Sequence, residues 1–228
     1  MLDSITGGQD SVGLRVPSHP VARALLDAFG GGIAAPSANR FGHVSPTTAA
    51  HVAADLGGAP AMILDGGACE IGIESTIVAF RDNAALLLRP GAISVAELAR
   101  VLGRSPQSAD GVAPRVSGSL AAHYSPRTPA SLLPVDALRA ELAHLLERDE
   151  RVAVLARTIG RPDDFDGVWI AGHRDVVDYA RDLYANLRSL DAAKADAILI
   201  EAPPDDAPWL AVRDRLTRAA QGEDDDRD

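Results

Sequence analysis

Two hydrophobic periods alternate along this chain, and together they predict short strands separated by helices. Apolar residues recur every three to four positions in several segments, most clearly in 175–193, where five of them share one helical face. In 19–29, Pro20 suits the first turn of such a helix. The segments with helical spacing are 19–29, 47–56, 95–102, 135–147, 175–193 and 209–220.

Short apolar runs bounded by glycine, proline or polar residues predict the strands. These runs are 13–16, 33–35, 62–64, 75–80, 85–88, 152–155, 169–170 and 197–201. Strands that alternate with helices are typical of α/β folds, and in the second half of the chain they predict a small parallel sheet.

Proline, serine and glycine interrupt this pattern over 104–131, where no apolar period survives. The stretch predicts a linker, and its length favours a functional role, such as a lid. It divides the chain into a first α/β part, 1–103, and a second, 132–221. The charged end, 222–228, predicts an acidic tail.

Charge narrows the classes of ligand. The chain of 228 residues has a formal net charge of −10, and most of the excess lies in 129–228, with 13 basic and 22 acidic residues. This half argues against a broad grip on a nucleic-acid backbone. Residues 1–128, with nine arginines and ten acidic residues, could hold an anionic small molecule.

The cysteine count and the hydropathy of the chain argue against disulfide-bonded and membrane-spanning classes of protein. The single cysteine, Cys69, allows no internal disulfide and no thiolate cluster, which favours a reducing, cytoplasmic compartment. No apolar run approaches 18 residues, so no membrane-spanning helix is expected. No Cys or His spacing is typical of a metal site, and we expect no metal-ligating residue.

The most informative polar residues lie in a loop of small side chains, 34–39, and just after it. Small side chains let a ligand approach the backbone closely, and Ser37, Asn39 and Ser45 add groups that suit a phosphate or carboxylate. The same residues are also typical of an ordinary turn.

Other polar residues interrupt or end apolar runs. Arg15 lies within one, so we expect it to be paired or to face a polar cavity. Arg89 ends another, where ligand-facing side chains are common. Ser75 could equally be a plain strand residue, and Tyr124 could either anchor the linker or cover a ligand. Only Lys194 is a lysine, so a bound phosphate would use arginines, hydroxyls and backbone N–H groups, or a lysine from elsewhere.

Several of these segments resemble the YrdC family, and residues 117–126 resemble the linker of its long, two-domain form, L-threonylcarbamoyladenylate synthase. Two later segments, 180–188 and 212–216, resemble the C-terminal domain of that form. The resemblance implies a partial YrdC-like α/β domain followed by a small Rossmann-like parallel α/β domain. The YrdC-like segments are 11–17, 35–39, 45–47, 63–67, 74–76 and 88–91.

The resemblance also implies a reaction. Family members condense L-threonine, bicarbonate and ATP into threonylcarbamoyl-AMP and pyrophosphate, with Mg²⁺ accompanying ATP. Downstream tRNA threonylcarbamoyl-transfer proteins would take the product for tRNA modification. No catalytic residue is implied, because positioning and electrostatics can drive the chemistry. Carried over by motif, the positions that contact ATP are Ser11, Ser37, Ser45, Arg89 and Tyr124, and those around threonine are Arg15, Ala35 and Ser75.

One part of the family pattern is missing from this sequence, a Lys-x-Arg motif that grips ATP near the N-terminus. The sequence therefore resembles an N-terminally truncated synthase, and we expect that the chain alone cannot make threonylcarbamoyl-AMP, because the loss of two cationic groups should lower the rate by several powers of ten. A nucleotide- or double-stranded-RNA-binding module without catalysis is the alternative, although the acidic balance weakens direct RNA binding. A regulatory or hydrolytic remnant of the same pocket is a third interpretation.

Overall fold

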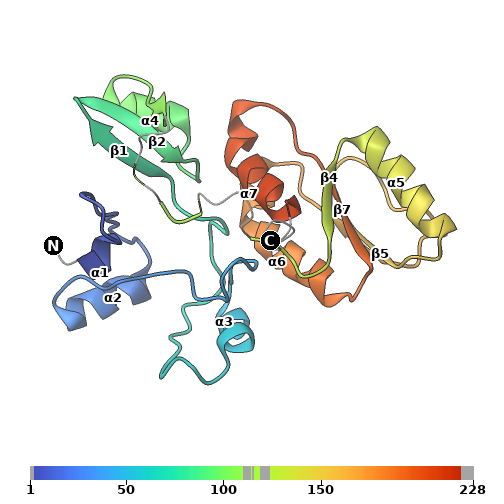
Figure 1. The fold of residues 1–228 in the computed structure, drawn as a ribbon, viewed down its shortest axis with the longest axis horizontal. Helices are drawn as coiled ribbons and strands as arrows, with labels where there is room; N and C mark the ends of the chain where they lie inside the picture. The colour runs from blue at the N-terminus through green and yellow to red at the C-terminus, as the bar shows by residue number, and fades with distance from the viewer. Residues whose placement is uncertain (1–2, 110–113, 115, 119–123, 222–228) are drawn as a thin grey trace.

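A computed structural model shows two α/β parts that meet along one face (Figure 1). It describes residues 3–109, 114, 116–118 and 124–221, apart from the side chain of Ser4. The predicted acidic tail and part of the predicted linker lie outside the described residues.

The second part is built on a parallel sheet in the order β4–β7–β5–β6, which confirms the predicted parallel α/β architecture. One strand, β4, was not predicted, because four residues beside a proline-rich stretch carry little periodicity. It forms by pairing with β7 and takes in the last two residues of the predicted linker. The strands are β4 (Ala130–Leu133), β5 (Val152–Ala156), β6 (Val168–Ala171) and β7 (Ala197–Glu201).

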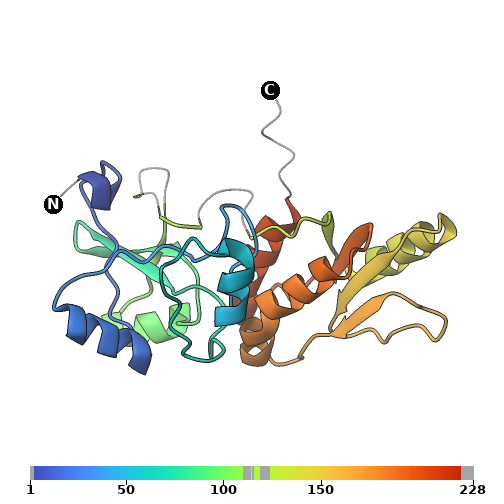
Figure 2. The same cartoon turned by 90° about the horizontal axis from the view of Figure 1, so that it is seen from below.

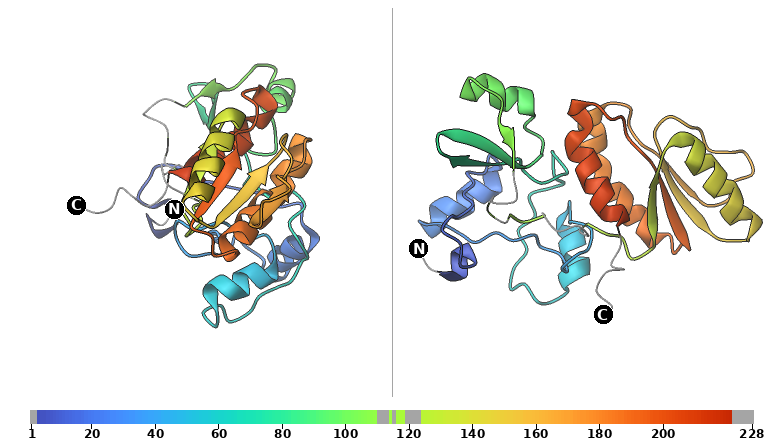
Figure 3. Two further views of the ribbon diagram at one scale, coloured as in Figure 1. Left: turned by 90° about the vertical axis from the view of Figure 1, so that its right-hand side faces the viewer. Right: turned by 45° about the horizontal axis from the view of Figure 1, so that its top comes forward.

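Helices cover both faces of this sheet (Figures 1 and 3). Helix α5 (Val135–Glu147) covers one face, whereas α6 (Val176–Ala192) and α7 (Leu210–Ala220), which follows the short helix η1 (Ala207–Trp209), cover the other. Successive strand residues point to opposite faces, so each strand serves two cores. The buried α5 core includes Val152, Val154 and Leu199, and the α6–α7 core includes Ala153, Leu155, Ile198 and Ile200.

The first part holds a smaller sheet in the order β1–β2–β3. Strands β1 (Ile77–Arg81) and β2 (Ala84–Arg89) form an antiparallel hairpin, and β3 (Gln107–Ser108) joins β2 in parallel. The turn residues Asp82 and Asn83 have φ values of 47° and 60°, as a two-residue type I′ turn requires.

Three helices of the first part lie close to their predicted bounds: α2 (Pro20–Phe29), α3 (Ala49–Leu56) and α4 (Val95–Leu102). The short α1 (Asp3–Thr6) was not predicted. Thr48 caps α3 by accepting the N–H of His51, which moves the start of this helix two residues past its predicted position.

Three predicted strands of the first part were wrong, because 13–16, 33–35 and 62–64 have no regular secondary structure. A strand needs a neighbour that completes its backbone hydrogen bonds, and no described segment pairs with these three. Their side chains stay exposed, as Leu14 and Val16 show at 86% and 95%. Within 3–109, the buried apolar residues are Val44, Ala85 and Leu86.

Helices α6 and α7 lie between the second sheet and the first part (Figures 1 and 2). Val44 and Ile73 of the first part pack against the core of these helices. Gly72 has a φ of +79°, and a Cβ there would overlap the backbone of Arg181 in α6. The loop around Gly72 is therefore pressed directly onto α6. No helix among the described residues is both long and apolar enough to cross a membrane.

Candidate functional site

Three segments of the first part meet helices α6 and α7: the loops 42–47 and 72–76, and segment 89–91, which begins with the last residue of β2. Strand pairing explains how two of them come together. Because β1 and β2 are antiparallel, Ile77 at the start of β1 lies opposite Arg89 at the end of β2. This pairing brings Ser75, just before β1, beside the guanidinium of Arg89.

Arg89 is a buried cation held by neutral groups. Its Nε and Nη2 donate to the carbonyl oxygen of Ser75 at 3.1 and 2.9 Å, and its Nη1 donates to the carbonyl oxygen of Ser117 at 2.8 Å. Only 6% of the residue is exposed. Burial, with a smaller contribution from the charge of Arg215, lowers the pKa of Arg89. No carboxylate of the described residues pairs with this guanidinium, so the site favours an anionic ligand.

Glu74 is the anionic side chain of the site, and neighbouring side chains donate hydrogen bonds to both of its carboxylate oxygens. Its Oε1 accepts from Ser45 Oγ at 2.9 Å, and its Oε2 accepts from the Tyr184 hydroxyl at 2.8 Å and from Arg215 Nε at 3.0 Å. Burial alone would raise the pKa of Glu74, but the charge of Arg215 and the three hydrogen bonds lower it. The carboxylate therefore stays ionised and acts as an anchor rather than as a proton donor.

Local sequence pattern predicts neither this role of Glu74 nor its partners Tyr184 and Arg215. These residues lie 110 and 141 positions away along the chain. The only available signal was the resemblance of 180–188 and 212–216 to the family's C-terminal domain, which marked the segments but not the contacts.

Tyr124 of the linker is buried between the two parts, with 1% of its surface exposed. Its ring lies 5.4 Å from that of Tyr184, and the guanidinium of Arg215 lies 5.7 Å from its centre. Gly118 passes so close that a Cβ there would overlap the Tyr124 hydroxyl. The next residue, Ser125, donates its N–H to the Gly42 carbonyl oxygen at 2.9 Å. The described linker residues thus run across the site beside Arg89.

The structure therefore brings together four of the sequence-flagged residues, Ser45, Ser75, Arg89 and Tyr124. The other four, Ser11, Arg15, Ala35 and Ser37, are exposed on segments without regular structure. The expectation that Arg15 is paired or faces a polar cavity was wrong, because the apolar run around it is itself exposed. Within the described part of the chain, the side chains of Ser11, Arg15 and Ser37 form no hydrogen bond or ion pair.

Asn39 behaves as a residue of an ordinary turn, which was the alternative interpretation of its loop. Its Nδ2 donates to the carbonyl oxygens of His43 at 2.8 Å and Arg40 at 3.0 Å, as a turn-closing side chain does. Asn39 therefore fixes the approach of the chain to Ser45.

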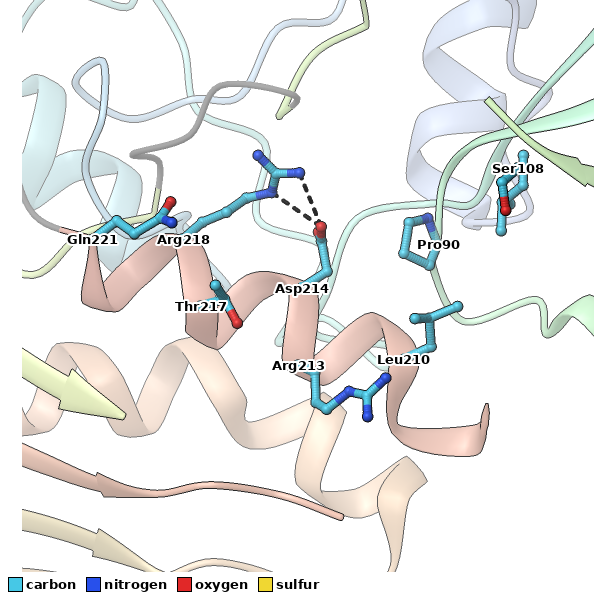
Figure 4. A pocket seen from close by; sticks show the side chains of 9 residues that line it. Pro90, Ser108, Leu210, Arg213, Asp214, Thr217, Arg218 and Gln221 are labelled. Atoms are coloured by element: carbon cyan, nitrogen blue, oxygen red, sulfur yellow. Dashed lines mark hydrogen bonds and ion pairs between the residues drawn. The ribbon is translucent and has the colours of Figure 1, made fainter. Parts of the chain in front are cut away.

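A hollow of about 640 Å³ adjoins the site between β2 and α7 (Figure 4). Its two arginines are already paired, Arg218 with Asp214 at 3.0 Å and Arg213 with Asp205. Their neutralised charge makes the hollow a weaker place for an anion than Arg89. Within the described ranges, no group of three His, Cys, Asp or Glu residues could hold a metal ion. The residues lining the hollow are Leu87, Pro90, Ser108, Leu210, Arg213, Asp214, Thr217, Arg218 and Gln221.

Two family models match this chain. The model described as "Telomere recombination" matches residues 1–91, and the model described as "Threonylcarbamoyl-AMP synthase, C-terminal domain" matches residues 93–221. The chain is 37% identical to the threonylcarbamoyl-AMP synthase of Bacillus subtilis and 35% identical to that of Pyrococcus abyssi. These alignments cover 96% and 95% of this chain but 65% and 66% of the relatives.

A solved structure shows the same arrangement of both parts. The crystal structure of P. abyssi Sua5 complexed with L-threonine matches with a TM-score of 0.85 and 31% sequence identity. The match covers 96% of this chain and 67% of that chain.

Proposed function

This chain belongs to the threonylcarbamoyl-AMP synthase family, and we propose that it binds ATP and L-threonine and takes part in their condensation with bicarbonate. Threonylcarbamoyl-AMP and pyrophosphate are the products of this reaction. The observation that carries the proposal is the buried guanidinium of Arg89, which among the described residues is held by the carbonyl oxygens of Ser75 and Ser117. The L-threonine in the matching P. abyssi structure supports the choice of amino acid.

In this proposal, Arg89 binds phosphate oxygens of ATP, and Ser45 turns its hydroxyl proton from Glu74 to one of these oxygens when ATP binds. Tyr124 lies beside them in the linker. Ser75 lies near threonine, and the remaining flagged residues, Ser11, Arg15, Ala35 and Ser37, complete the two sites from the exposed segments. A guanidinium and hydroxyl groups placed around a phosphate stabilise the charge that develops as pyrophosphate leaves.

We further propose that Mg²⁺ enters with ATP as part of the substrate. The product would pass to tRNA threonylcarbamoyl-transfer proteins in the cytoplasm. No protein nucleophile is needed, since aligned substrates and a preorganised charge can supply most of the rate increase.

Calorimetry with the purified chain tests the binding step, with ATP and Mg²⁺ in one titration and L-threonine in the other. Pyrophosphate release in the presence of all three substrates then tests the reaction. We expect both ligands to bind, and we expect any release of pyrophosphate to require threonine and bicarbonate. Binding of both ligands with little release of pyrophosphate would agree with the missing Lys-x-Arg motif. Binding of ATP without L-threonine would favour the alternative, a nucleotide-binding module without catalysis. Failure to bind either ligand would contradict the proposal.

A further inference from the structure

Two side chains of the second part reach into the proposed substrate site of the first. Arg215 on α7 has no exposed surface although it carries a charge, and Tyr184 on α6 is 1% exposed. Both donate to the same carboxylate oxygen, Oε2 of Glu74, at 3.0 and 2.8 Å. Two side chains of the second part thus converge on one acidic side chain of the first.

Arg215 also fixes the backbone on both sides of the site. Its Nη1 donates to the carbonyl oxygen of Pro90 at 2.8 Å and to Asp214 at 2.7 Å, and its Nη2 lies 3.4 Å from the carbonyl oxygen of Glu74. Pro90 directly follows Arg89, and Glu74 directly precedes Ser75. One guanidinium therefore spans the two segments that carry these site residues.

The contacts continue to a third segment. The second carboxylate oxygen of Glu74 accepts the hydroxyl of Ser45, so a residue that Arg215 and Tyr184 hold fixes the place of the Ser45 side chain before a ligand binds. Gly91 packs so tightly against the backbone around Thr76 that a Cβ at Gly91 would overlap it. The segments 74–76 and 89–91 are therefore packed directly against each other.

A buried ion pair is a poor way to stabilise a contact between two parts, because desolvation cancels much of the attraction and apolar side chains can serve as well. Its advantage is geometric, since a planar guanidinium fixes several acceptors in one arrangement. We propose that Arg215 and Tyr184 are positioning residues of the substrate site, and that they act through Glu74 to orient Ser45 and the Ser75 backbone. The inference rests on the proposed function for the identity of the ligands.

The first test compares ligand affinity in Arg215→Met, Arg215→Lys and Tyr184→Phe. Calorimetry with ATP and with L-threonine should show affinity at least about tenfold weaker for Arg215→Met, with part of the loss restored in Arg215→Lys. Arg151→Met is the matched control, because that arginine lies in the same part, pairs with Asp196 and is 68% exposed. The control should bind both ligands within about twofold of the unchanged chain.

A double-mutant cycle separates positioning from general destabilisation. If Arg215 acts through Glu74 on Ser45, then Arg215→Met should weaken ATP binding much less in a Ser45→Ala chain, by about threefold or less. Equal losses in both backgrounds would overturn the inference, because an effect on folding alone does not depend on one hydroxyl.

Hydrogen exchange in the absence of ligand tests the positioning role independently of which ligands bind. In Tyr184→Phe and Arg215→Lys, the backbone amides of 44–47 and 74–76 should exchange about tenfold faster, while those of β5 and β7 keep their protection. Unchanged exchange in 44–47 and 74–76 would overturn the inference even if affinity falls. If the unchanged chain binds neither ligand but these amides respond, the proposed function fails and the positioning role stands.

Discussion

Glu74 and Arg89, the two central charged residues of the site, lie on neighbouring segments but have different kinds of hydrogen-bond partner. Glu74 accepts three hydrogen bonds from side chains, one of which comes from a guanidinium. Within the part of the chain that the structure describes, Arg89 donates to the carbonyl oxygens of Ser75 and Ser117 and to no carboxylate. A paired charge anchors structure, whereas a charge held by dipoles alone gains most from an incoming anion.

Replacing Arg89 should therefore weaken the binding of ATP more than it weakens the fold. Arg89→Met removes one charged hydrogen-bonding group, and we expect calorimetry to show about 1.5–3 kcal/mol less favourable binding. Arg100→Met is the control, because Arg100 is an exposed residue in the last turn of α4. Unchanged ATP affinity in Arg89→Met would show that the anion binds elsewhere.

Glu74 also predicts a dependence of stability on pH. Because its pKa is lowered in the folded protein, the folded state binds fewer protons than the unfolded state near the ordinary carboxyl pKa of 4.5. The stability from this group is complete above that pH and is lost as pH falls through the lowered pKa. Urea unfolding of Glu74→Gln between about pH 6 and 3 should show a shallower loss than the unchanged chain. An identical pH profile would contradict the ion pair with Arg215.

Among the secondary-structure elements, β7 ends in a side chain that occupies a position where an anion could otherwise bind. Ligands commonly bind at the carboxyl ends of such strands. Here Glu201, 1% exposed, accepts the N–H groups of Arg157 at 2.7 Å and Thr158 at 2.8 Å, together with the Thr158 hydroxyl. The chain's own carboxylate thus fills the backbone cradle that follows β5.

Removing that carboxylate should destabilise the second part. Glu201→Ala leaves the N–H groups of Arg157 and Thr158 without their acceptor, and we expect the free energy of unfolding in urea to fall by about 1–3 kcal/mol. Glu147→Ala, an exposed position at the end of α5, should change it by less than about 0.5 kcal/mol. Equal effects of the two substitutions would argue against a structural role for the cradle.

At the scale of the whole molecule, the first part depends on its contact with α6 and α7. It buries few apolar residues of its own. Polar contacts across the boundary compensate, notably from Arg188 of α6. This guanidinium pairs with Asp55 at 2.5 Å and donates to the carbonyl oxygens of Val44 at 2.5 Å and Ser45 at 3.1 Å. With 17% and 18% of the two side chains exposed, the pair is largely shielded from water.

Arg188→Met should loosen the first part while leaving the second intact. The substitution leaves Asp55 without its ion-pair partner and two carbonyl oxygens without their donor. We expect the free energy of unfolding to fall by about 1–3 kcal/mol. Hydrogen exchange should speed up about tenfold or more in α3 and in segment 44–47, with α5 and β5 unchanged. Arg151→Met should leave α3 as it is, and uniform exchange changes along the chain in Arg188→Met would contradict the local role.

Local pattern was enough to predict most of the second part. Its helices α5 and α6 and strand β7 carry complete amphipathic or apolar runs, and their bounds match the prediction closely. Sequence motifs also flagged Ser45, Ser75, Arg89 and Tyr124, which the fold brings to one place. Such features are encoded within a few residues of one another, so the sequence determines them directly.

Features that depend on partners far away along the chain are determined by tertiary contacts. Segment 13–16 has the composition of a strand but no neighbour to pair with, whereas β4 has little pattern and becomes a strand beside β7. The same holds for Glu74, whose partners Tyr184 and Arg215 are brought to it by the docking of α6 and α7. Strand pairing and buried ion pairs are satisfied across the fold rather than along the chain, so no local period can specify them.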